Sequence, residues 1–131
     1  HPNDHRPPRQ LGLLLQRQGE HHRAVEQFRQ ALKRNRKNPW LHNNLAWSYV
    51  KIGLPIKAYR LWDEAIELFP EHGFLLAAKA RAHRSQKEYS RALQCLKRYA
   101  EREENVRWRG KPIREGIEEL ERLKAKAQAQ R

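Results

Sequence analysis

The sequence contains an internal repeat with a period of 34 residues, which limits the folds that the chain can adopt. Gly19 recurs as Gly53 at this spacing. The other matches between the first and second repeats are Leu11 with Leu45, Leu15 with Tyr49, Ala24 with Ala58, Phe28 with Trp62, and Ala31 with Ala65. One period later the matches are Ala46 with Ala80, Ala58 with Ala92, and Trp62 with Leu96. A fixed period of this length indicates stacked units that bury their apolar faces against their neighbours.

Within each repeat, the apolar residues have the spacing of amphipathic helices. In the first repeat these residues are Val25, Phe28, Ala31 and Leu32. No alternation of period two is long enough to form a strand. The sequence therefore predicts an all-α chain of antiparallel helix pairs.

Prolines and glycines mark the expected ends of these helices. Asn38 followed by Pro39 is typical of a helix start, because asparagine caps free backbone amides and proline fits the first turn. Gly53 with Pro55 predicts the bend inside the second repeat. The expected organisation is an N-terminal tail at 1–4, repeats at 5–38, 39–72 and 73–106, and a linker with a capping helix at 107–131.

The third repeat departs from the pattern, and its second helix is expected to be longer or shifted. The departures are Lys79, His83, Tyr99 and Glu104, which replace the expected Leu, Tyr, Ala and Pro. A polar stretch follows from Arg102 to Lys111, and Pro112 is expected to open a last helix. Its apolar face consists of Ile113, Ile117, Leu120 and Ala127. Such a helix would cap the bare end of a repeat stack.

These residues resemble the tetratricopeptide repeat, whose pattern is W-x2-L-G-x2-Y followed by A-x3-F, A and P. The first repeat supplies Leu11-Gly12-x2-Leu15, Ala24-x3-Phe28 and Ala31. The second supplies Leu45-Ala46-x2-Tyr49, Ala58-x3-Trp62, Ala65 and Pro70. The resemblance implies a right-handed solenoid of helix pairs. It also implies a concave groove, lined by the first helix of each pair, that holds an extended peptide or a partner helix.

When the repeats are aligned with the pattern of the resembled family, basic, amide and aromatic side chains fall in the implied groove. The candidate peptide-binding residues are Arg9, Asn43, Asn44, Trp47, Lys51, Arg81 and Arg84. Arginine pairs carboxylates in a bidentate manner and tryptophan supplies anchor area, so an acidic or mixed acidic and apolar peptide is the expected partner. The alternatives are that Trp40 and Trp47 are core residues between repeats and that the arginines form a solvated face.

One subgroup of the resembled family grips the C-terminal carboxylate of heat-shock chaperones with a clamp of Lys, Asn, Asn, Lys and Arg. In this sequence Asn44 matches one clamp asparagine, and Arg9 replaces the first lysine with another cation. The remaining three positions hold Leu13, Phe74 and Ala78. The sequence therefore favours a non-enzymatic protein-binding scaffold without that particular clamp.

Charge supports a second hypothesis, the binding of single-stranded RNA or DNA. The chain has 28 basic and 15 acidic side chains, a net charge of +13, which indicates acidic partners or a nucleic acid or membrane surface. One basic cluster consists of Lys33, Arg34, Arg36 and Lys37. Another, Arg107-Trp108-Arg109-Gly110-Lys111, combines charge with an aromatic ring that could stack on bases. A third hypothesis is self-association through the first helix or the capping helix.

Other functions find little support in the sequence. No run of apolar residues is long enough to span a bilayer. The single cysteine, Cys95, cannot form an intramolecular disulfide and is expected to be buried, and no nucleophile or phosphate-binding motif occurs. His21 and His22 are adjacent and point about 100° apart on a helix, so no metal site and no cofactor are expected. The sequence begins at His1 and contains no methionine, so a signal segment is expected to be already gone if there was one. The expected compartment is the cytoplasm by default, and a processed exported chain would look the same.

Overall fold

The computed structural model describes residues 7–102 and 107–130, and side chains of all of these except Arg107. The predicted tail at 1–4 and the pattern position Glu104 lie outside the described residues. The chain divides into two units, His1–Pro70 and Glu71–Arg131, and each is described by itself.

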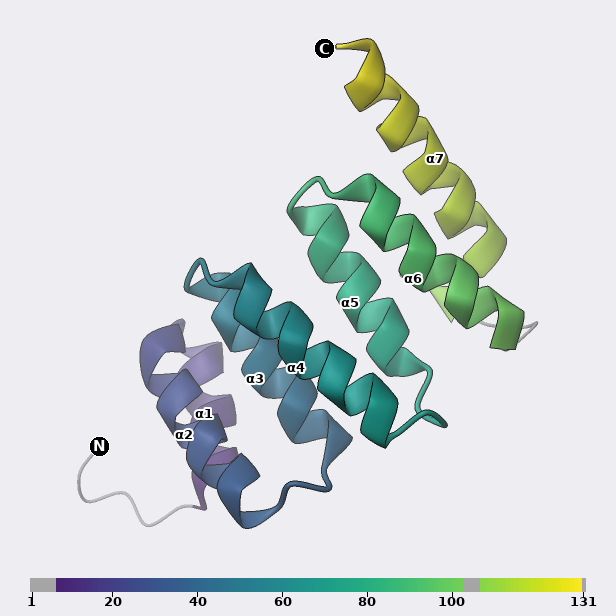
Figure 1. The fold of residues 1–131 in the computed structure, drawn as a ribbon. Coiled ribbons are helices and arrows are strands. Elements are labelled where there is room, and N and C mark those ends of the chain that lie inside the picture. Colours follow the sequence, from purple (N-terminus) through teal and green to yellow (C-terminus); the bar gives the residue numbers. More distant parts are fainter. Residues whose placement is uncertain (1–6, 103–106, 131) are drawn as a thin grey trace. The chain divides into compact units, whose positions relative to one another are not determined.

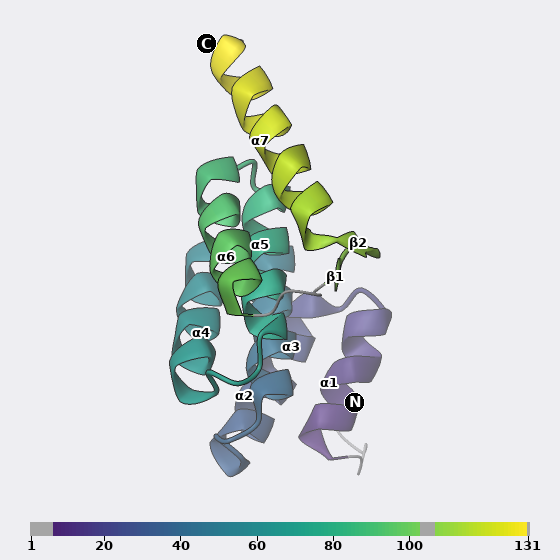
Figure 2. The same cartoon turned by 90° about the vertical axis from the view of Figure 1, so that its right-hand side faces the viewer.

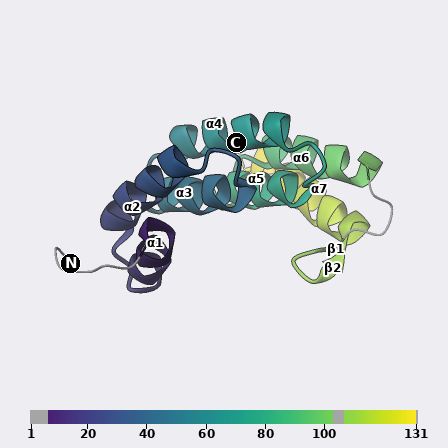
Figure 3. The ribbon, with the colours of Figure 1, turned by 90° about the horizontal axis from the view of Figure 1, so that it is seen from below.

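The first unit consists of two antiparallel helix pairs, as predicted (Figure 1). Its helices are α1 (Pro8–Arg17), α2 (His21–Arg34), α3 (Pro39–Lys51) and α4 (Pro55–Leu68). Helix α2 packs against both α1 and α3, and α4 packs against α3 (Figure 3). The predicted cap at the start of α3 is confirmed, because Oδ1 of Asn38 accepts hydrogen bonds from the amides of Trp40 and Leu41 at 3.0 and 3.2 Å.

The small residues of the repeat pattern lie at the close helix contacts in the first unit. Ala24, Ala46 and Ala58 are fully buried, as are the bulky Phe28 and Trp62. A Cβ at Gly12 would lie 2.6 Å from Cε1 of Phe28, so only glycine lets α1 approach this ring.

The second unit contains one helix pair, a short hairpin and a last helix. These are α5 (Phe74–Ser85), α6 (Tyr89–Arg102), β1 (Arg107–Trp108), β2 (Lys111–Pro112) and α7 (Ile113–Ala129). Helix α6 begins 34 residues after α4, so its start is not shifted. Whether it is longer depends on residues 103–106, which lie outside the described residues. Ala80, Ala92 and Leu96 keep their buried places, and these preserve the packing of the pair despite the other departures.

The hairpin corrects the prediction of a polar linker and of a chain without strands. Trp108 pairs with Lys111 in an antiparallel ladder, and Arg109 and Gly110 form the turn with φ angles of 55° and 77° (Figure 2). The indole of Trp108 is 2% exposed, and its Nε1 donates to the carbonyl of Ala77 on α5 at 3.4 Å. This side chain fills the core of the second unit together with Leu120 of α7.

Helix α7 supplies the apolar cover predicted for the end of the chain. It packs against α6, with Ile113 and Leu120 buried and Ile117 partly buried. A Cβ at Gly116 would lie 2.5 Å from Cε3 of Trp108, so this glycine admits the indole beside the helix. Among the described residues, no helix combines the length and the apolar character needed to cross a membrane.

Candidate functional site

Four of the partly or fully exposed side chains of α3 lie on one side of the helix. Trp40, Asn44, Trp47 and Lys51 are separated by steps of four, three and four residues, which is the spacing of one helical stripe. Trp40 is 50% exposed and Lys51 is exposed, whereas Asn44 and Trp47 are partly buried. We call these four residues the α3 stripe. Three of them are predicted groove residues, so the structure brings this part of the predicted site together.

Helix α1 is tied to α3 beside this stripe. Nε2 of Gln16 donates to Oγ of Ser48 at 3.3 Å and to the backbone carbonyl of Asn44 at 3.5 Å. Arg9, the predicted site residue on α1, is exposed in the first turn of that helix. The first helices of both pairs therefore contribute polar groups to the first unit's surface.

The two tryptophans of the stripe have different environments. Trp40 is half exposed and is not a core residue. The ring of Trp47 meets the ring of Trp62 edge-on, with centroids 5.2 Å apart and an interplanar angle of 80°. Trp47 thus rests on the core with one side and keeps part of its ring at the surface.

Asn43 has a structural partner. Its Oδ1 accepts a hydrogen bond from Nε1 of Trp62 at 2.9 Å, and the Trp62 side chain is fully buried. An indole N–H in the core needs such an acceptor, because leaving it unpaired costs free energy. This bond occupies the amide oxygen of Asn43, which the sequence predicted as a groove residue.

The two predicted arginines of the second unit, Arg81 and Arg84, have different surroundings. Arg81 is exposed on α5. Nη2 of Arg84 donates to Oε1 of Glu119 on α7 at 2.7 Å, and Nη1 of Arg109 lies 3.5 Å from the same oxygen. The hydrogen bond from Arg84 holds the pKa of Glu119 below its usual value of 4.5. Arg84 therefore links α5 to α7.

The nucleic-acid hypothesis relied on an aromatic ring that the structure buries. Trp108 packs inside the second unit, so this indole is not available for stacking on bases. Lys33 and Arg36, from the other basic cluster, are exposed and contribute to a hollow in the first unit.

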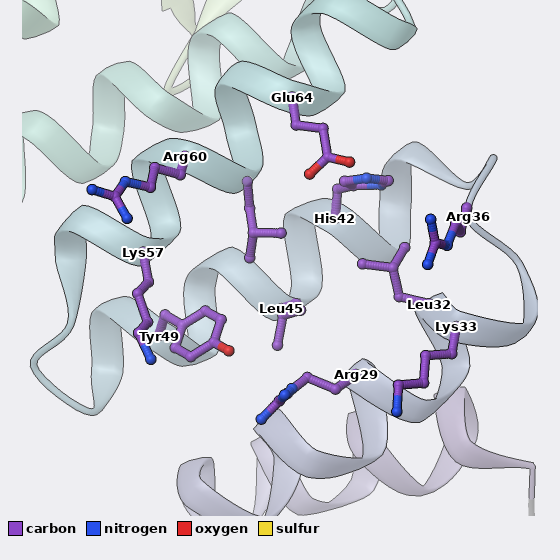
Figure 4. A pocket seen from close by; sticks show the side chains of 11 residues that line it. Arg29, Leu32, Lys33, Arg36, His42, Leu45, Tyr49, Lys57, Arg60 and Glu64 are labelled. Carbon is purple, nitrogen blue, oxygen red and sulfur yellow. The ribbon is translucent and has the colours of Figure 1, made fainter.

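That hollow lies between α2 and α4 with α3 as its floor, and sequence reasoning missed it (Figure 4). Its volume is about 460 Å³. Its cations are Arg29, Lys33 and Arg36 from the α2 side and Lys57 and Arg60 from α4. The spacing of four between Arg29 and Lys33, and of three between Lys57 and Arg60, could have indicated two basic helix faces.

The described residues contain no group of three or more His, Cys, Asp or Glu side chains close enough to hold a metal ion. Cys95 is buried, as predicted. His42, also buried, places Nδ1 3.0 Å from the backbone carbonyl of Asn38 and packs edge-on against Phe69. These side chains serve the packing of their own units.

Fold and surface together define a helical-repeat protein built from antiparallel helix pairs. Residues 9–48 match the sequence profile described as tetratricopeptide repeat, and the chain has the fold of tetratricopeptide-repeat domains. The resemblance and the fold class predicted from the sequence are confirmed. No curated protein sequence matches the chain at a significant level.

Two solved structures show the similarity over nearly the whole chain. The TPR domain of Sgt2 from Aspergillus fumigatus is 21% identical, with a TM-score of 0.77 over 93% of this chain and 80% of that one. The TPR2B domain of yeast Sti1, solved in a complex with pHsp70, is 25% identical. Its TM-score is 0.69, and the match covers 95% of each chain.

Proposed function

We propose that this chain is a non-enzymatic scaffold module that binds an acidic, or mixed acidic and apolar, peptide on its first-helix surface. The observation that carries the proposal is the α3 stripe. Half-exposed Trp40 and partly exposed Trp47 stand beside Asn44 and Lys51 on one side of one helix. An exposed tryptophan on a rigid helix is a typical anchor for a partner protein.

Each side chain of the stripe has a distinct role in this proposal. The indoles of Trp40 and Trp47 cover apolar side chains of the peptide. The amide of Asn44 both donates and accepts hydrogen bonds, so it suits the backbone of an extended chain. Lys51 pairs with a peptide carboxylate, and Arg9 on α1 supplies a second cation.

The complex of the Sti1 domain supports a role in protein binding, because a domain of the same fold is seen there with pHsp70. The partner proposed for the present chain differs from a chaperone tail. Of the five positions of the chaperone-tail clamp, only Arg9 and Asn44 carry suitable groups. The basic and aromatic character of the stripe favours an acidic segment that also presents large apolar side chains.

A pull-down of the full chain from its source organism, followed by titration of a labelled peptide from the captured protein, tests this proposal. Trp40→Ser with Lys51→Glu is expected to weaken peptide binding at least about tenfold, because it removes an anchor and reverses a charge. Both residues are exposed, so helical content should stay unchanged. Leu68→Ser with Arg98→Glu is the matched control, because it alters an exposed apolar residue and an exposed cation elsewhere.

Trp47→Ala with Arg81→Ala is a second test of the predicted residues. Peptide binding is expected to weaken while circular dichroism stays close to that of the unmodified chain. If helical content falls and binding falls with it, the two residues are structural. Normal binding by the Trp40 and Lys51 variant would overturn the proposal, and concentration-dependent mass in light scattering would favour self-association instead.

A further inference from the structure

The side of helix α3 opposite the stripe faces a hollow. His42, Leu45 and Tyr49 follow each other by three and four residues and form the floor of the hollow between α2 and α4 (Figure 4). On a helix these positions lie roughly half a turn away from Trp40, Asn44, Trp47 and Lys51. A ligand in the hollow and a peptide on the stripe therefore would not compete for the same surface of α3.

The walls of the hollow carry an excess of positive charge. Three cations stand on the α2 side and two on the α4 side, whereas Glu64 is the one carboxylate among the lining residues. Within the described ranges, 7–102 and 107–130, none of the five cations forms an ion pair. Other arginines in the same ranges do, since Arg23 pairs with Glu20 at 3.0 Å and Arg91 with Glu88 at 3.7 Å.

An excess of cations around one hollow causes mutual repulsion and attracts anions. The five come from two helices and the turn that follows α2, so they surround the space from different sides rather than following a line. This arrangement favours a compact anion with several charges over an extended strand, which would need a continuous basic track.

The floor adds an apolar component. Leu45 is buried, Leu32 and Leu61 are partly buried, and the ring of Tyr49 lies under the ammonium group of Lys57, with Nζ 5.6 Å from the ring centroid. A volume of about 460 Å³ lies within the range of about 300–1,000 Å³ typical of small-molecule sites. The hollow is thus large enough for phosphate groups near the cations and an aromatic body on the floor.

We propose that this hollow binds a multiply phosphorylated small molecule. Three of its five cations are arginines, whose planar guanidinium groups match phosphate oxygens in a bidentate manner. Inorganic polyphosphate and nucleoside polyphosphates share this chemistry. The ligand neutralises the repulsion between the α2 and α4 walls, and so it stabilises the first unit by binding its folded form.

The test is calorimetric titration of the full chain, at low salt and without divalent metal, with tripolyphosphate and separately with adenosine triphosphate. Arg29→Gln with Arg60→Gln removes one guanidinium from each wall and is expected to weaken binding by about tenfold or more. Lys33→Gln with Lys57→Gln should have a similar effect. Arg98→Gln with Arg122→Gln is the matched control, because it removes two exposed charges that do not line the hollow.

Tighter binding of adenosine triphosphate would support the proposal and assign the floor to the base, and equal binding would support it through phosphate recognition alone. No binding of either probe would overturn it. An equal loss of affinity in the wall variants and the control variant would also overturn it, because binding of the probes would then depend only on the net charge of the chain. Tight binding of a single-stranded oligonucleotide that tripolyphosphate fails to displace would favour a nucleic-acid surface instead.

Discussion

The hydrogen bond between Asn43 and Trp62 joins the two helices of the second pair, and its contribution to the free energy of unfolding can be measured. Nε1 of Trp62 donates to Oδ1 of Asn43 at 2.9 Å, and the indole is 0% exposed. Asn43→Ala leaves this buried N–H without its acceptor. The cost of an unsatisfied buried donor is about 1–3 kcal/mol, so we expect a loss of this size in the free energy of unfolding.

A double-mutant cycle separates the bond from the rest of the packing. Trp62→Phe removes the donor, and in that background Asn43→Ala should cost less than about 0.5 kcal/mol. The difference between the two backgrounds gives a coupling energy of about 1–2 kcal/mol for residues in contact. Urea unfolding followed by circular dichroism measures all four proteins, and Asn44→Ala on the partly exposed stripe serves as the control.

A cost below about 0.5 kcal/mol for Asn43→Ala in both backgrounds would contradict a stabilising role for this hydrogen bond. The amide of Asn43 would then contribute nothing measurable to the core, and a role in peptide binding alone would explain its position. A large cost that is equal in both backgrounds would show that the alanine disturbs packing rather than this bond.

Three further predictions concern the backbone, the helix contacts and pH. Lys87→Gly is expected to raise the free energy of unfolding by about 0.5–1 kcal/mol, because Lys87 has a φ of 60° where the other repeats have glycine. An unchanged urea midpoint would contradict this gain. Gly12→Ala is expected to lower the free energy of unfolding by about 1–3 kcal/mol, because the new Cβ would lie 2.6 Å from the Phe28 ring. An unaltered melting curve would contradict this loss. Stability is also expected to fall as the pH drops below 6.5, because burial lowers the pKa of His83 and only the unfolded state then readily takes up a proton. Urea titrations across this range should show the slope, which His83→Gln should flatten and the exposed His22→Gln should leave in place.

The helix pairs were predictable because their signals are local and repeated. A period of 34 residues and the residues Gly12, Ala24 and Phe28 define which faces must touch, since each unit packs mainly against its neighbour in sequence. The same regularity kept α6 in register although Lys79 and His83 depart from the pattern. Helical spacing also sufficed to place three of the candidate residues on one side of α3.

The hairpin was not predictable in the same way. Strands of two residues have no periodic signal, and a tryptophan between two arginines resembles an exposed stacking group. The burial of Trp108 depends on the carbonyl of Ala77, 31 residues away, and on the space that Gly116 leaves beside α7. Only the folded chain brings these three positions together.

The repeat, most helix ends and the side of α3 that carries the tryptophans follow from the order of the amino acids alone. Tertiary structure decided which polar groups are already in use, because the partners of Asn43 and Arg84 come from other helices, 19 and 35 residues along the chain. It also decided that the cations of α2 and α4 surround one hollow. In a sequence, charges on separate helices cannot be told from ordinary solvent-exposed charges. They act together on a ligand only after helix packing has brought them close to one another.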